Sequence, residues 1–76
     1  MKIGIDLGGS HIGVGIIKDG KIFSTIEKNL TRQDRVNIEE TIINEIHRMI
    51  IEILLKTNIN IEDIEAIGIA APRNYK

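Results

Sequence analysis

The chain has 76 residues, a formal net charge of −1 and no cysteine. A chain of this length can bury one hydrophobic core, so we expect a single domain over residues 1–76. Acidic and basic residues are intermingled, which excludes a basic surface for a nucleic-acid backbone. The lack of cysteine excludes disulfides and thiolate metal sites. No apolar run has the length of a membrane span or a signal peptide, so we expect a cytoplasmic protein with no membrane partner.

The amino-terminal part of the chain has the period-2 apolar pattern of β-strands. Apolar residues alternate with glycine or polar residues over three segments, residues 2–7, 11–18 and 21–28. Asp19-Gly20 is a strong hairpin signal, and Gly8-Gly9 predicts an earlier turn. Centring that earlier turn on Gly8-Gly9 pairs Ile5 with Ile12 and Asp6 with His11. We therefore expect three antiparallel strands, with glycine along one face of the sheet.

The apolar period then changes to that of an amphipathic helix between residues 38 and 55. Asn37 is expected to cap the start of this helix together with Glu40, with Asp34 as a competing start. Asn58 suits the left-handed position at the end of the helix. The small apolar residues of 65–71 stop at Pro72 and predict a strand buried on both faces. A right-handed crossover would place this strand parallel to the first.

Together these elements predict an α/β fold with three antiparallel strands, one long helix and a fourth strand parallel to the first, in sheet order 3-2-1-4. If Asp19-Gly20 sets the register, both faces carry apolar side chains: Ile17, Ile22 and Ile26 on one, and Val14, Ile16 and Phe23 on the other. One helix cannot cover both faces. We therefore expect one partly apolar face to stay open.

Residues 6–10, Asp-Leu-Gly-Gly-Ser, are the main candidate site. Adjacent glycines allow backbone N–H groups to approach an anion without interference from a Cβ, and Ser10 adds a hydroxyl donor. The Asp6 carboxylate suits a magnesium ion, which prefers oxygen ligands and retains its waters. Phosphates held beside magnesium would suit phosphoryl transfer. A plain hairpin turn fits the same residues, and they do not decide between the two interpretations alone.

The order of motifs resembles the amino-terminal segment of the ROK family (repressors, open reading frames and sugar kinases), within the actin and hexokinase superfamily of ATPases. The resemblance covers residues 3–72 and is most specific at 6–10 and at 68–72, Gly-Ile-Ala-Ala-Pro. It implies a ribonuclease H-like half-lobe of an ATP-dependent, glucokinase-like hexose kinase. It also implies that Asp6 lies near Mg²⁺, and that Gly8, Gly9 and Ser10 lie near the ATP phosphates.

The chain departs from the family pattern in places. Family members often have lysine where this chain has His11, and they continue Ala-Pro-Gly where it has Ala71-Pro72-Arg73. The family's catalytic aspartate and sugar-binding residues have no counterpart in these 76 residues, so the resemblance implies a truncated kinase that is inactive alone.

Two other functions remain open. One is a stand-alone interaction module with the same fold and no nucleotide role, which forms a homodimer or larger assembly through an exposed sheet face or edge. The other is weak binding of phosphate or nucleotide without catalysis. The first requires an uncovered surface, and the second requires only the turn at residues 8–10.

Overall fold

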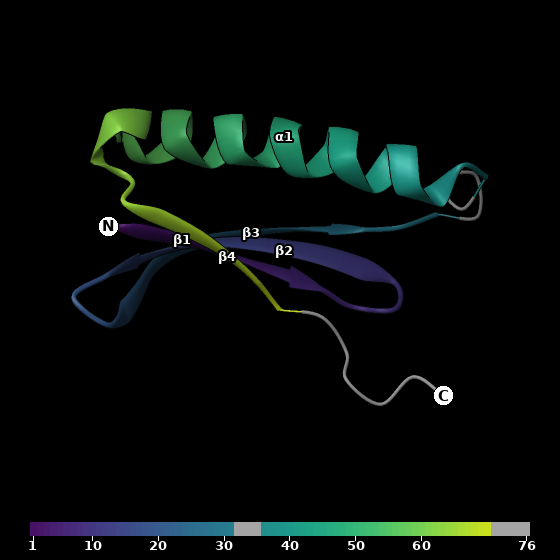
Figure 1. The fold of residues 1–76 in the computed structure, drawn as a ribbon, viewed down its shortest axis with the longest axis horizontal. Coiled ribbons are helices and arrows are strands. Elements are labelled where there is room, and N and C mark those ends of the chain that lie inside the picture. The colour runs from purple at the N-terminus through teal and green to yellow at the C-terminus, as the bar shows by residue number, and fades with distance from the viewer. Residues whose placement is uncertain (32–35, 71–76) are drawn as a thin grey trace.

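The computed structural model describes residues 1–31 and 36–70 (Figure 1). Strands β1 (Lys2–Leu7), β2 (His11–Lys18) and β3 (Lys21–Asn29) form an antiparallel meander. Helix α1 (Ile38–Thr57) and the short 3-10 helix η2 (Ile61–Asp63) lead to β4 (Ala66–Ala70), which is parallel to β1. The sheet order is β3-β2-β1-β4. This confirms the α/β fold and the strand order that the sequence predicts.

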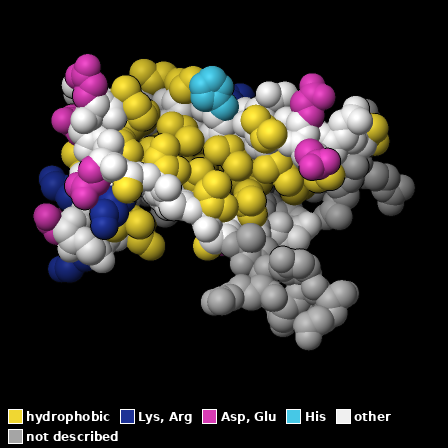
Figure 2. All heavy atoms as spheres, in the orientation of Figure 1, with side chains coloured by type: hydrophobic (Ala, Val, Ile, Leu, Met, Phe, Trp, Pro, Cys, Tyr) yellow, Lys and Arg dark blue, Asp and Glu magenta, His cyan; other side chains and the backbone are white. Residues whose placement is uncertain are grey.

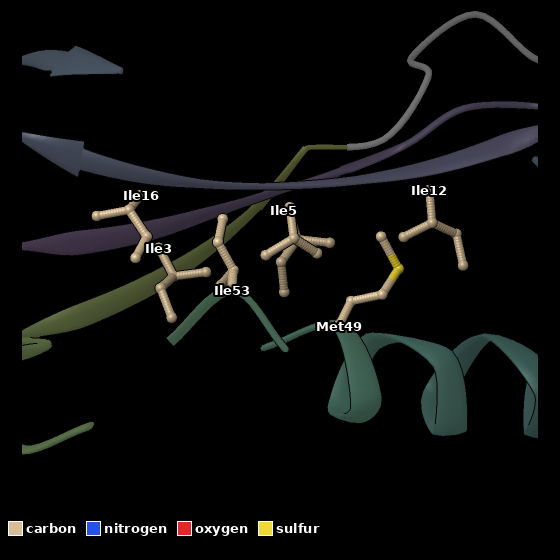
Figure 3. Close-up of a cluster of buried hydrophobic side chains, with 7 residues drawn as sticks. Ile3, Ile5, Ile12, Ile16, Met49 and Ile53 are labelled. Carbon is tan, nitrogen blue, oxygen red and sulfur yellow. The ribbon is translucent and has the colours of Figure 1, made fainter. Parts of the chain in front are cut away.

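The core lies between α1 and one face of the sheet. Figure 3 shows Met49 and Ile53 of α1 pointing toward the aliphatic side chains of β1 and β2. The buried apolar side chains of the described chain are Ile3, Ile5, Ile12, Val14, Ile16, Met49 and Ile53. Their alternation with glycine and polar residues along the strands fixes which face α1 covers. The opposite face, called the open face below, has no helix over it within the described residues.

The β1–β2 hairpin has a different register from the one expected. Ile5 lies opposite Val14, and each pairing is displaced by two residues from the prediction. The Gly8 N–H donates to the His11 carbonyl at 2.9 Å, so the turn is centred on Gly9-Ser10. A shift by two residues leaves each side chain on the same face, because side chains alternate with a period of two. The expected assignment of faces for β1 and β2 therefore survives the wrong register.

The β2–β3 hairpin turns where the sequence predicts, and a bulge follows it. Asp19 and Gly20 have φ angles of 54° and 76°, the left-handed pair of a type I′ turn. Between Ile16 and Ile17 the register shifts, which leaves Phe23 with no opposite residue on β2. Beyond this extra residue Ile26 packs against the core, so the expectation that it shares a face with Ile17 is wrong.

Asparagine stands at both ends of α1 in the left-handed conformation. Asn37 has φ 65° and ψ 52° and makes no side-chain capping hydrogen bond, so the expected capping box with Glu40 is wrong. A capping side chain requires extended backbone at this position, which Asn37 does not adopt. Asp34, the competing start, lies outside the described residues. Asn58 has φ 58° and ψ 39°, which confirms its expected role at the end of the helix.

Strand β4 is exposed along its length, contrary to the expectation of a strand buried on both faces. Ile67 and Ile69 are 49% and 63% exposed. The reason is the position of α1, which packs mainly over β2 and β3, toward the edge of the sheet opposite β4. The apolar composition of this segment thus predicted a strand correctly but predicted its burial wrongly. No helix among the described residues is long and apolar enough to cross a membrane.

Candidate functional site

The residues that the sequence singled out lie together at one end of the sheet. Asp6 is opposite Ala70 near the ends of β1 and β4, and the turn of residues 8–10 follows β1 directly. Because β1 and β4 are parallel, their carboxyl ends share this end of the sheet. In open α/β sheets, ligands bind outside the carboxyl ends of the strands. The fold therefore places Asp6 and the turn where such a ligand would bind.

A shallow groove of about 680 Å³ runs along the open face and ends beside Asp6. Its volume is within the range of small-molecule sites. Glycines from three strands line it: Gly4, Gly13, Gly15 and Gly68. Glycine inside a strand weakens the strand and often marks a close approach of a ligand or another backbone. The carboxylates of Asp6 and Glu27 lie at one end of the groove, on either side of Gly13.

The imidazole of His11 covers Gly8. A Cβ at Gly8 would lie 2.5 Å from His11 Cε1 and 2.6 Å from Nδ1, closer than real Cβ atoms approach other atoms. The Nε2 atom of the same ring is 3.6 Å from Asp6 Oδ2. Asp6 itself pairs with Gly13 across the strands, so it meets His11 diagonally and not in the direct pairing that we expected. Packing of His11 thus explains the glycine at position 8.

Gly9 has no such explanation. A Cβ there would meet no atom within 4 Å, and Gly20 is the only glycine of the described chain with a positive φ. Neither packing nor backbone conformation therefore requires glycine at position 9. The space beside residue 9 is open, and the role of Gly9 near a phosphate stays a prediction.

Ser10 completes the exposed part of the turn. Its carbonyl accepts a hydrogen bond from the Leu30 N–H at 2.8 Å, which fixes the turn against the end of β3. None of the residues 8–10 has a positive φ, so the turn lacks the left-handed residue of an αR–αL anion-binding nest. The Gly8 N–H is already bonded to His11. The Ser10 hydroxyl is a donor that this turn can offer an anion without breaking these backbone hydrogen bonds.

Magnesium would have few protein ligands here. Among the described residues, no group of three or more His, Asp or Glu side chains is arranged to hold a metal ion. Asp6 is exposed at the end of the groove and can supply one carboxylate. Mg²⁺ commonly binds through one or two carboxylates and keeps waters and phosphate oxygens as its other ligands. Asp6 fits that mode of binding and no mode in which the protein encloses the ion.

Glu27 is the residue of this region that the sequence did not indicate. It lies on β3, opposite Gly13, and so shares a row across the sheet with Asp6. The correct registers of both hairpins are needed to find it. The displaced first turn and the bulge at Phe23 concealed this relation in the sequence.

Comparison with protein-family models finds no match to this chain, and no curated protein matches its sequence. The resemblance to the ROK family consequently rests on the order of the motifs and stays a prediction.

Proposed function

We propose that Asp6, Gly8, Gly9 and Ser10 bind the phosphates of Mg-ATP as the amino-terminal part of an ATP-dependent hexose kinase of the ROK type. The observation that carries the proposal is the placement of Asp6 and the exposed turn at the carboxyl ends of β1 and β4, beside a groove lined with glycine. The motif order supports the same function. Such an enzyme would act on a hexose in the cytoplasm.

Each residue has a separate task in this proposal. The Ser10 hydroxyl donates a hydrogen bond to a phosphate oxygen, and the missing side chain of Gly9 allows that oxygen to approach the backbone. Gly8 leaves room for the His11 ring. Asp6 accepts hydrogen bonds from water on Mg²⁺, which neutralises phosphate charge when it is bound. These contacts position a nucleotide but transfer no proton.

We expect these 76 residues to bind phosphate without catalysis. Transfer to a sugar requires a general base within hydrogen-bond reach of the hydroxyl. The family resemblance assigns that role to an aspartate outside the motifs present here. With only one side of a nucleotide site, the dissociation constant for Mg-ATP should be about 1 mM or weaker, equivalent to roughly 4 kcal/mol of binding free energy.

Calorimetric titration with tripolyphosphate tests the turn directly. Ser10→Ala should weaken binding about tenfold, because a hydrogen bond to a charged group contributes about 1.5 kcal/mol or more. Ser24→Ala is the matched control, since Ser24 lies on β3 away from the turn. Asp6→Asn should weaken binding of Mg-ATP but not of tripolyphosphate without magnesium. Equal effects of the two serine variants would contradict the phosphate site.

A second function has support from a different observation. Figure 2 shows apolar side chains over the middle of the side that carries α1 and β4, with charged side chains toward its ends. The exposed large apolar residues include Ile43, Ile51, Leu55, Ile67 and Ile69. Extended apolar surfaces of this kind mark sites of protein association. We therefore also propose a module that self-associates through an exposed face or edge of the sheet. Light scattering that shows a stable monomer at about 100 μM, well above a micromolar dissociation constant, would contradict this function.

A further inference from the structure

We infer that two copies of the chain associate by pairing their β4 strands antiparallel, about a twofold axis at Gly68. This inference rests on the self-associating function proposed above and chooses the edge of the sheet over its face. It does not involve the phosphate site, which lies at the end of β1 and in the turn of residues 8–10.

The two edges of the sheet differ in how they meet solvent. β3 carries Lys21, Glu27 and Lys28 and is interrupted by the bulge at Phe23. Charged residues and bulges are the features that keep an edge strand from pairing with another chain. β4 has the sequence Ala-Ile-Gly-Ile-Ala, with no charge, no proline and an unbroken register against β1. Only β4 is therefore an edge that another strand can join.

The free side of β4 is accessible in the described structure. The strand pairs with β1 on one side, and it crosses in front of β1 in Figure 1. All of its residues are exposed. A Cβ placed on Gly68 would meet nothing within 4 Å, so a side chain introduced there, which would project from a face of the sheet, has room.

The sequence of β4 reads the same in both directions about Gly68. An antiparallel pair centred on Gly68 therefore places Ile67 opposite Ile69 of the second copy and Ala66 opposite Ala70 of the second copy. Cross-strand pairs of β-branched residues stabilise a sheet, and opposed glycines allow the backbones to approach closely. This match of β4 to itself in antiparallel order makes a second copy the occupant that this edge fits.

The pairing joins two four-stranded sheets into one continuous sheet with both α1 helices on the same side. Because the twofold axis is perpendicular to the sheet, the apolar surfaces beside β4 in the two copies become neighbours (Figure 2). Strand pairing alone buries less area than a stable dimer interface of about 1,200 Å². We therefore expect a dissociation constant in the micromolar range.

A charge exchange tests which edge is used. The double variant Ile67→Lys/Ile69→Lys places lysine opposite lysine across the axis, and Ile67→Glu/Ile69→Glu places glutamate opposite glutamate. Each double variant on its own should raise the dissociation constant of the dimer at least tenfold, roughly the effect of two unfavourable cross-strand pairs. An equimolar mixture of the two should recover a dimer, because every lysine then faces a glutamate. Ile22→Lys on β3, at a residue that is 72% exposed, should leave association unchanged. Circular dichroism should show that all variants remain folded.

Single cysteines test the position of the axis in a chain that has none of its own. Gly68→Cys should form a disulfide dimer under mild oxidation, because opposed residues of paired strands lie within the Cα separation of a disulfide. Ala70→Cys should not, because its own copy would lie about 13 Å away along the strand. A mixture of Ala66→Cys and Ala70→Cys chains should cross-link to each other.

The outcomes separate this inference from the functions proposed above. If the wild-type chain is a monomer at about 100 μM, both the edge dimer and the self-associating function are overturned. That concentration is on the order of a hundred times a dissociation constant of about 1 μM. A dimer in which Gly68→Cys and Ala70→Cys cross-link at equal rates overturns the edge dimer alone. If Ser10→Ala loses tripolyphosphate binding while its dimer is unchanged, this supports a phosphate site and a dimer edge that act independently.

Discussion

Replacement of Gly8 by alanine should destabilise the protein through the ring of His11. The new Cβ would lie 2.5 Å and 2.6 Å from two ring atoms, so the ring must move. The side chain of His11 is 35% exposed, which allows it to rotate into solvent while the backbone stays in place. A displaced side chain in an unfavourable rotamer costs about 1 kcal/mol, and the 3.6 Å contact between His11 and Asp6 is lost with it.

Urea unfolding followed by circular dichroism at a fixed protein concentration measures this cost. Gly9→Ala is the matched control, because its Cβ meets nothing within 4 Å and should change stability by less than about 0.5 kcal/mol. In a His11→Ala background, Gly8→Ala should lose most of its effect, which gives a coupling free energy of about 1 kcal/mol in a double-mutant cycle. An undiminished loss of stability in that background would show that the ring of His11 is not the cause.

Other substitutions have outcomes that follow from burial and backbone conformation. Ile53→Ala, at a fully buried residue, should lower the free energy of unfolding by about 3 kcal/mol. Leu55→Ala, at a residue that is 77% exposed, should lower it by less than about 0.5 kcal/mol. Similar urea midpoints for the two variants would show that Ile53 does not belong to the core. Asn37→Ser should destabilise by about 1 kcal/mol because serine is strained at φ 65°, while Asn37→Gly should not. If serine were tolerated better than glycine in the same unfolding assay, side-chain capping would be the dominant contribution after all. Gly20→Ala should cost about 1 kcal/mol through its φ of 76° alone, since no atom obstructs its Cβ, and an unchanged midpoint would contradict the left-handed turn.

The strand order could be predicted from the sequence because two of its determinants are local. The Asp19-Gly20 turn fixes the second hairpin, and the change from a period of 2 to a helical period marks the crossover that makes β4 parallel to β1. The open face could be predicted because the chain has one long helix, which can cover only one of the two partly apolar faces of the sheet. These features depend on residues near one another in the chain.

The site residues could be named but not arranged. Two adjacent glycines do not reveal which of them begins the turn, so the register was wrong by two residues and the contact between His11 and Asp6 was assigned to direct pairing. The bulge at Phe23 has no sequence signal of its own, and it controls where Glu27 and Ile26 face. Asn37 was predicted to cap α1 because asparagine serves as both a capping residue and a left-handed residue. In each case tertiary packing decides between conformations that the local sequence permits equally.

The exposure of β4 also bears on how the molecule folds and opens. None of the buried core side chains among the described residues belongs to β4, so the meander of β1, β2 and β3 with α1 can assemble the core before β4 joins the sheet. Pairing of Lys2 with Ala66 joins residues near opposite ends of the described chain, and such distant contacts are slow to form. Amide hydrogens of β4 should consequently exchange with solvent through detachment of this strand, at a smaller free-energy cost than exchange from the core. A partner strand on the free edge would slow that exchange without adding to the core.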